Sequence, residues 1–491
     1  MFVKYTFSDW EASPDKRALL KDIISSYKTS ADFKTAKSAQ RYYESDNEKI
    51  LEKVILQADA ITVKDENGRE KVAYTNRTIE GNRIRGNFFQ RLVDQQASYL
   101  LGNGVSLGKE EEKDALGLGF DMNLAQIGQD ALVHGVCWGF WNYDHVECIP
   151  AYTDALSGAV ALLDERTSAP RVLIQFWQID ANRKMHVRVF TEEKIYNFTE
   201  NDDNDLIPEK DMPEEAYITV KAIDGAGAAV IGQNGYGKLP IVPFWANKEH
   251  RSELTLAIKS KIDLHDRIFS DFGDNLDMAN DVYWVLNNFG GNSNEALQMM
   301  KQIHELKAII NISDGVSAGS TAEPHSFEVP YEARQIALDL LKKSIFDDFM
   351  GLDMSSLTGG YLTNIAIKAA MTSMDLKANK FEWQAFNFVQ QILSLIGIKT
   401  ERIRFKRAGL INEQEMIQNI YQMREDIDQK TALKLNPMID QEDVDDIIKA
   451  SEAEKAGMGD EEPEEREILT GPEDEYQAER ETRRESGVIF R

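Results

Sequence analysis

The most regular stretch of the chain is residues 363–396, TNIAIKAAMTSMDLKANKFEWQAFNFVQQILSLI. Its apolar residues recur at steps of four and three, the spacing of one face of an α-helix. They are Ile367, Met371, Met374, Ala378, Phe381, Ala385, Phe388, Ile392 and Leu395. We expect one helix about 50 Å long, because an α-helix rises roughly 1.5 Å per residue. Globular helices average about 11 or 12 residues, so its length sets this element apart, and the stripe is predicted to pack in the core.

Seven other segments show the same helical spacing. The first carries Leu19, Leu20, Ile23, Ile24 and Tyr27 on one face. Ser252 is the expected N-cap of another, and Gly102-Asn103-Gly104 is expected to end a third. The predicted helices span residues 15–60, 88–101, 123–134, 252–278, 331–349, 412–424 and 440–456.

Strands are predicted where the period changes to two. Short runs rich in Val, Ile and aromatic residues extend from residue 135 to about 198, and an edge strand with two prolines follows at 239–247. A small mixed region contains strand 281–289, helix 293–307, strand 308–313 and loop 314–325, and a last strand lies at 401–407. Loops are expected at 63–82, 201–215 and 351–362, and residues 225–240 are glycine-rich. The fold class is therefore α+β, mainly helical.

Composition restricts the function. The 491-residue chain has a formal net charge of −27, whereas proteins that neutralise DNA phosphates are basic. Any contact with DNA is therefore expected to be weak and non-adhesive. No apolar run approaches the roughly 18 residues of a membrane helix, and the start, MFVKYTFSDW, does not resemble a signal peptide. We expect a protein of the cytoplasm, or of a particle assembled there.

Metal, redox and catalytic motifs are not found. Cys137 and Cys148 form no CxxC pair, and no two of the seven histidines have HxxxH or HxxxxH spacing. We expect two free thiols, no metal and no cofactor. GxSxG and HExxH are absent, and paired acids are too common to mark a site. An enzyme is therefore not expected.

One glycine motif resembles a nucleotide-binding loop. Residues 232–238, GQNGYGK, match that loop, but Leu239 replaces the Ser or Thr that binds Mg²⁺. Such a loop also needs a helix whose N-terminal amides face the phosphates, whereas Pro240 and Pro243 follow here. A glycine-rich hairpin explains the motif better than a nucleotide site.

Basic residues cluster on two predicted helices, 252–278 and 331–349. Acids are interspersed among them, so an ordinary mixed-charge helix face is an equal alternative to a binding surface. The basic residues are Lys259, Lys261 and Arg267 on the first helix, and Lys342 and Lys343 on the second.

Three stretches, in this order, resemble the portal proteins of tailed double-stranded-DNA bacteriophages, in the family typified by the Bacillus siphophage portals. They are NRIRGNFFQRLVDQQASYLLGNGVSL (82–107), LPIVPFWANKEHRSEL (239–254) and DIDQKTALKLNPMIDQEDVDDIIKASEAE (426–454). One departure precedes the long helix, where the family often has Ser-Gly-x-Ala-Leu-Lys and this chain has Thr363–Lys368 without the glycine.

The resemblance implies a ring of a dozen subunits with four named regions. They are a wing, a stem of two helices, a clip between these helices, and a crown. In this sequence they would be the wing 1–250, stem helix 251–278, clip 279–330, stem helix 331–350, tunnel loop 351–362, tunnel helix 363–397 and crown 398–456, followed by an acidic disordered tail, 457–491.

The resemblance also implies a function and partners. The ring would be a channel at one capsid vertex of the virion, through which double-stranded DNA is packaged by the terminase large subunit and later leaves. Other partners would be the major capsid and scaffolding proteins and a head–tail adaptor, with no membrane. DNA would pass the loop residues Met354, Ser355, Ser356, Leu357 and Thr358, and the basic residues named above would face the lumen.

Two alternatives stay open at this point. The chain is an ATP-dependent packaging motor or helicase, which would need an intact nucleotide loop, or it is a head–tail scaffold or adaptor that forms no ring. Light scattering distinguishes a closed ring from a monomer or a small oligomer.

Overall fold

The long helix is present as predicted and organises the core of the computed structural model. Helix α11, Asn364–Leu395, begins at Thr363, whose side chain accepts a hydrogen bond from the Ala366 amide. All nine residues of the predicted stripe are buried. Its first half packs with Tyr99 and Leu352, and its second half joins the largest hydrophobic cluster, which includes Phe244 and Leu124.

The structure describes most of the chain. These residues are 4–64, 70–224, 227–279, 283–287, 321–325, 331–357, 363–409, 413–423, 427–436, 439, 444 and 447–451. They belong to two compact units, Met1–Leu410 and Ile411–Arg491.

The first sixty residues do not form the single helix that we predicted. They form α1 (Phe7–Ala12), α2 (Lys16–Thr29), α3 (Ala31–Tyr43) and α4 (Glu48–Leu51), followed by a strand. Ser30 causes the break, because its extended backbone ends α2 and its hydroxyl accepts a hydrogen bond from Phe33 N to cap α3. Of the predicted apolar face, Leu20, Ile23, Ile24 and Tyr27 are buried and Leu19 is partly buried.

The other helices of this part agree closely with the prediction. Helix α5 spans Phe88–Leu101, as expected, and α7 spans Phe120–His134, three residues longer at its start than predicted. Between them lies the short α6, Glu110–Asp114.

Strands within residues 136–216, together with one at 241–245, form two packed sheets, as the period of two indicated. One has the order β10-β9-β8-β7-β6, with β11 also paired to β9, and the other has the order β14-β4-β5. The 201–215 segment, predicted as a loop, contains β10 and β11. The bounds are β4 Val136–Asn142, β5 His145–Pro150, β6 Gly158–Leu163, β7 Pro170–Trp177, β8 His186–Phe190, β9 Lys194–Glu200, β10 Leu206–Pro208, β11 Glu214–Ala216 and β14 Ile241–Trp245.

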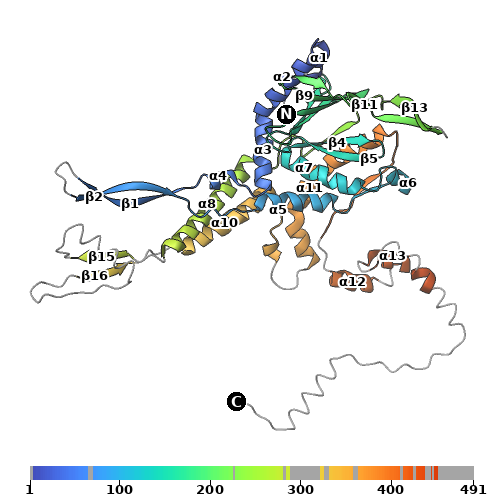
Figure 1. Ribbon diagram of the computed structural model, residues 1–491. Helices are drawn as coiled ribbons and strands as arrows, with labels where there is room; N and C mark the ends of the chain where they lie inside the picture. Colours follow the sequence, from blue (N-terminus) through green and yellow to red (C-terminus); the bar gives the residue numbers. More distant parts are fainter. Residues whose placement is uncertain are drawn as a thin grey trace, which may run out of the picture. The chain divides into compact units, whose positions relative to one another are not determined.

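Alternation along β6 explains how the larger sheet is covered on both faces. Val160 and Leu162 pack against α2 and α3, whereas Ala159, Ala161 and Leu163 pack against the sheet that contains β4 and β14. Successive side chains of a strand point to opposite faces, so helices cover one face and a second sheet covers the other (Figure 1).

The structure contradicts one predicted loop and confirms one predicted hairpin. The loop predicted at 63–82 is wrong, because β1 (Ile55–Lys64) and β2 (Glu70–Ile79) pair antiparallel over ten residues each. Hydrogen bonds between the two strands hold such a pair together without an apolar face, so polar residues are tolerated there. The glycine-rich hairpin is confirmed: β12 (Ile218–Asp224) pairs with β13 (Gly227–Asn234). A further short pair joins β3 (Val105–Leu107) to β17 (Ile403–Phe405).

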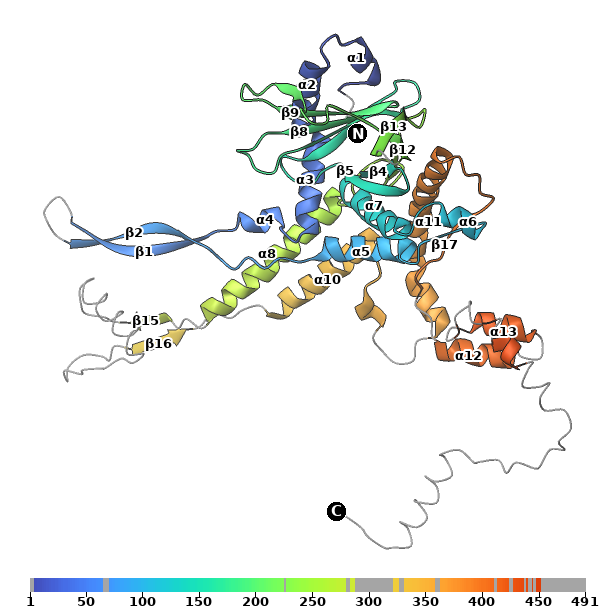
Figure 2. The same cartoon turned by 45° about the vertical axis from the view of Figure 1, so that its right-hand side comes forward.

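Helices α8, Leu256–Ala279, and α10, Tyr331–Phe349, run side by side (Figure 2). Helix α8 begins later than predicted: Thr255 Oγ1 accepts a hydrogen bond from Ile258 N, whereas Ser252 Oγ accepts one from Leu254 N in the preceding turn. Between these helices, β15 (Tyr283–Asn287) pairs with β16 (Thr321–His325), so residues 321–325 are a strand and not a loop. The predicted helix 293–307 and strand 308–313 lie outside the described residues.

The second unit contains α12, Glu413–Gln422, and α13, Gln429–Leu435. Helix α13 was not predicted, and Asp428 caps it by accepting a hydrogen bond from the Thr431 amide. Of the predicted helix 440–456, residues 444 and 447–451 are described and are helical. The predicted tail, 457–491, lies outside the described residues.

A close contact between β4 and α11 supplies the first prediction. A Cβ atom added at Gly139 would overlap the buried Phe388 ring. We therefore expect Gly139→Ala to lower the free energy of unfolding by about 1–3 kcal/mol, the usual cost of overpacking. Urea unfolding followed by far-UV circular dichroism measures this. Gly409→Ala, which would meet no atom within 4 Å, is the matched control and should leave the midpoint unchanged.

Candidate functional site

A buried ion pair lies where the three longest helices meet. Lys377 of α11 contacts Glu253, just before α8, at 2.8 Å between Nζ and Oε2. The same ammonium donates to the carbonyl oxygen of Phe349, the last residue of α10, at 2.8 Å. The two side chains are only 13% and 15% exposed. Burial lowers the pKa of Lys377, and the charge of Glu253 opposes this shift.

The segment predicted as a DNA-facing loop starts in a fixed position. The Leu352 amide donates to Gln95 Oε1 at 2.9 Å, and Gln95 Nε2 donates to the Leu352 carbonyl at 3.0 Å. Lys342 of α10 forms an ion pair with Asp353 at 3.1 Å and donates to Ser355 Oγ at 2.9 Å. Ser355 also donates its amide to Asp353 Oδ1 at 3.1 Å. Although burial opposes it, the hydrogen bonds from Ser355 and Lys342 to this carboxylate and the charge of Lys342 lower the pKa of Asp353.

Four of the five candidate loop residues are described by the structure, and the fifth is not. A 3₁₀ turn spans Met354–Leu357, which includes Ser355 and Ser356. Met354 is 48% exposed, and Ser355 is also exposed. Thr358, like 359–362, lies outside the described residues.

The five candidate basic residues are not equivalent. Lys259 is half-buried against Glu48, with 2.9 Å between Nζ and Oε2, and also donates to Ser38 Oγ. Lys261 donates to Ser344 Oγ at 2.6 Å and pairs with Asp348, and Lys342 is bound as described above. Arg267 and Lys343 are exposed. Three of the five are therefore used in contacts within the subunit.

A row of polar residues on α8, here called the polar ladder, was not identified from the sequence. An extended segment, 82–86, runs along α8 in the opposite direction. Every second residue of this segment donates its backbone amide to a side chain of α8, and the accepting side chains are four residues apart. The bonds are Gly86 N to Asp266 Oδ1 (2.9 Å), Ile84 N to Ser270 Oγ (2.9 Å) and Asn82 N to Asp274 Oδ1 (2.6 Å). Asp266 and Ser270 are fully buried. The four-residue spacing of these polar residues was the available signal.

The glycine motif at 232–238 has a structural role. Lys238 Nζ donates to the carbonyl oxygen of Ser394 near the end of α11, at 2.8 Å. The motif ends β13 and is followed along the chain by strand β14, not by a helix. This placement agrees with the predicted hairpin and argues against a nucleotide site.

The two cysteines lie together with one acid, which the sequence analysis did not foresee. Cys137 Sγ and Cys148 Sγ are 3.3 Å apart, and Cys148 donates to Asp130 Oδ2 at 3.2 Å. Both thiols are free, as predicted. Burial raises the pKa of the Cys137 thiol and that of Asp130. The sulfur–sulfur contact and the hydrogen bond to Asp130 therefore form a hydrogen-bonded cluster in the core.

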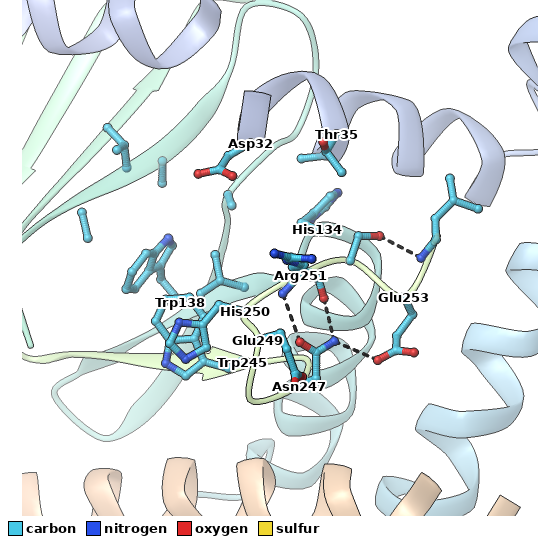
Figure 3. Close-up of a pocket in the computed structure, with 18 of the residues that line it drawn as sticks. Asp32, Thr35, His134, Trp138, Trp245, Asn247, Glu249, His250, Arg251 and Glu253 are labelled. Carbon is cyan, nitrogen blue, oxygen red and sulfur yellow. Dashed lines mark hydrogen bonds between the residues drawn. The ribbon is translucent and has the colours of Figure 1, made fainter. Parts of the chain in front are cut away.

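A pocket of about 640 Å³ lies between α3, β4 and the segment that leads into α8 (Figure 3). Its lining includes His134 and Trp138, and the rings of Trp245 and His250 stack there at 3.7 Å. Burial lowers the pKa of His134 to about 3, and its Nε2 atom lies 2.9 Å from Gln40 Oε1. A histidine held neutral in this way is not arranged for acid–base chemistry near neutral pH.

No helix among the described residues is both long enough and apolar enough to cross a bilayer.

The fold and the site describe an α+β protein whose polar side chains mainly fix its own long helices, as in a structural component. Residues 24–457 match the family model described as phage portal protein, SPP1 Gp6-like. Because the match covers most of the sequence, the chain belongs to this family of phage portal proteins, which is structural.

Two curated relatives agree with this assignment. The chain is 23% identical over 377 residues to the portal protein of Clostridium phage phiCD119, covering 73% of this chain and 79% of that protein. It is 25% identical over 221 residues to the portal protein of Bacillus phage SPP1, covering 42% of each. The resemblance inferred from the three sequence stretches is thereby confirmed.

The buried ion pair gives the second prediction. Removing one partner of such a pair leaves an uncompensated buried charge, which costs about 3–5 kcal/mol. We expect Lys377→Met to lower the free energy of unfolding by about this amount in urea titrations, and the double variant with Glu253→Gln to recover most of the loss. Lys49→Met removes an exposed pair with Glu52 and should cause no measurable change. Equal stability of Lys377→Met and the wild type would contradict this account.

Proposed function

We propose that this chain is the subunit of a portal ring, which forms the channel at one vertex of a phage capsid. Double-stranded DNA would enter through this channel during packaging and leave through it toward the tail. The observation that carries the proposal is the match of residues 24–457 to the portal family. The paired helices α8 and α10 and the long α11 are elements suited to lining and bracing such a channel.

We assign the regions of the ring as the family resemblance suggests. Residues 1–250 would form the wing, α8 and α10 the stem, and 279–330 the clip. Residues 351–362 would be the tunnel loop, α11 the tunnel helix and 398–456 the crown. The ion pair of Lys377 with Glu253 supports this assignment, because it fixes the tunnel helix to both stem helices.

Charge supports a channel through which DNA slides. The net charge of −27 per subunit would be repeated around a ring, so most of its surface would repel phosphate groups. Since Lys259, Lys261 and Lys342 are paired within the subunit, Arg267 and Lys343 are the better candidates for transient contact with the DNA backbone. Contacts to phosphate carry no base information, which suits passage of any sequence.

We propose the segment 351–362 as the part of the subunit that approaches the DNA most closely. Its first residues are anchored to α5 through Gln95 and to α10 through Lys342. This anchoring would position Met354 and Ser355 while leaving them exposed. Hydroxyl groups can contact phosphate without a fixed charge, so the segment would guide DNA without trapping it.

ATP hydrolysis would belong to a partner, the terminase large subunit. Lys238 is bound to Ser394 at the end of α11, which supports a subunit without a nucleotide site of its own. Saturable ATP binding that is lost in Lys238→Ala would instead favour the packaging-motor alternative. The major capsid and scaffolding proteins and a head–tail adaptor would be the other partners.

Ring formation is the direct test of this proposal. We expect the purified full-length chain to elute as one large species, with a mass by light scattering that is a multiple of 55.7 kDa and corresponds to about a dozen subunits. Negative-stain images should show closed rings with a central hole. A monomer or small oligomer at micromolar concentration would instead support the alternative of a non-ring scaffold or adaptor.

The tunnel loop gives a separate prediction. Replacing Ser355 and Leu357 together with Asp adds negative charge at the proposed closest approach to DNA. Folding and ring formation should be unchanged, whereas the number of DNA-filled capsids in infected cells should fall at least tenfold. Ala181→Asp with Asn182→Asp, in an exposed turn of the wing, is the charge-matched control. Normal DNA filling in the loop variant would show that the loop does not meet the DNA.

A further inference from the structure

Helix α11 has a second apolar face, opposite the one buried in the core. Ile365, Leu376 and Trp383 are 79%, 53% and 67% exposed. They are spaced by 11 and 7 residues, and a helix of 3.6 residues per turn completes three turns in about 11 residues and five turns in 18. The three side chains therefore lie in one line along the helix. Phe386 extends this face, with its ring 6.3 Å from that of Trp383.

The charges around this face are of one sign. The exposed residues of α11 are Ile365, Ala366, Lys368, Ala369, Thr372, Ser373, Leu376, Asn379, Lys380, Trp383, Asn387, Gln390, Gln391 and Ser394. They include two lysines and no acid. The nearest acids on the helix, Asp375 and Glu382, are both bound to Arg407. The exposed residues of α11 therefore carry a net positive charge in a chain of net charge −27.

The same chain carries a surface of complementary character on other elements. Leu118 is fully exposed and Met122 is 72% exposed, where α6 leads into α7. Glu110, Glu111 and Asp114 are exposed beside them, against one exposed lysine, Lys109. This acidic apolar patch fits a basic apolar helix in both hydrophobicity and charge. A ring requires such a pair of different surfaces on each subunit, because its contacts are head-to-tail.

We propose that the exposed face of α11 docks on a second copy of this chain, with Trp383 and Leu376 as its apolar anchors and Lys368 and Lys380 facing the acidic patch around Leu118. This inference rests on the proposed function, because it specifies which surface closes the ring. Exposed apolar patches rimmed by polar residues mark interaction sites, and aromatic anchors such as Trp contribute most of the binding energy at interfaces.

The apolar anchors are tested by substitution in the full-length chain. Trp383→Ser with Leu376→Ser should reduce the ring fraction, measured by light scattering at fixed concentration, at least tenfold. Far-UV circular dichroism should not change, because both side chains are exposed and the subunit fold does not depend on them. Trp383→Phe alone should retain rings. Ile179→Ser removes an equally exposed side chain, 86% accessible, outside both surfaces and should also retain them.

Charge reversal tests the complementary patch. Lys368→Glu with Lys380→Glu should lower the ring fraction at low salt, and adding Glu110→Lys, Glu111→Lys and Asp114→Lys should restore it. Failure of the second set to restore rings would overturn the assignment of this patch as the contact.

The outcomes separate the inference from the function on which it rests. If the wild type forms rings and Trp383→Ser with Leu376→Ser forms them equally well, the docking proposal fails and the portal function stands. The docking proposal also fails, and the portal function stands, if Ile179→Ser lowers the ring fraction equally. The same conclusion follows if Trp383→Ser with Leu376→Ser forms normal rings that no longer bind the major capsid protein. If the wild type forms no rings, the proposed function itself fails.

Discussion

The ion pair between Lys377 and Glu253 is the contact on which the arrangement of the long helices depends. Its two residues come from segments 124 positions apart, and the ammonium also binds the last carbonyl of α10. Removing both charges from water is costly, so the pair persists only because the two groups and the carbonyl satisfy one another. An apolar contact would tolerate rotation of α11 about its axis, whereas a buried ion pair specifies one orientation. That orientation decides which face of α11 enters the core and which remains exposed.

The long helices were predictable because their signals are local. The stripe of α11 has nine residues, and the same residues that define it in the sequence are those buried in the fold. The ends of α5 and α10 were equally clear. The prediction for 63–82 was wrong, because a two-stranded hairpin can form from mostly polar residues, which show no apolar pattern. Ser30 was missed because a single serine can either continue a helix or cap the next one.

The candidate site was less predictable, because its chemistry depends on partners distant in the sequence. Lys259 and Lys261 looked available for DNA, yet Glu48 and Asp348 bind them from other helices. Cys137 and Cys148 are separated by 11 positions. The pairing of β4 with β5 brings the two thiols together, and the packing of α7 on these strands adds Asp130. Composition correctly indicated an acidic protein with sparse basic side chains. It could not show which of those side chains are already neutralised.

The polar ladder has a mechanical consequence for α8. Two residues of an extended chain advance about 6.6–6.8 Å, and four residues of a helix advance about 6 Å, so successive rungs coincide only approximately. A small axial displacement of α8 would therefore break all three amide bonds together. The amides and their acceptors would match again only after a displacement of about 6 Å along the helix axis. The three amide bonds therefore couple the axial position of α8 to that of the segment 82–86. Any force along α8 is passed directly to the β1–β2 hairpin, which this segment joins to α5.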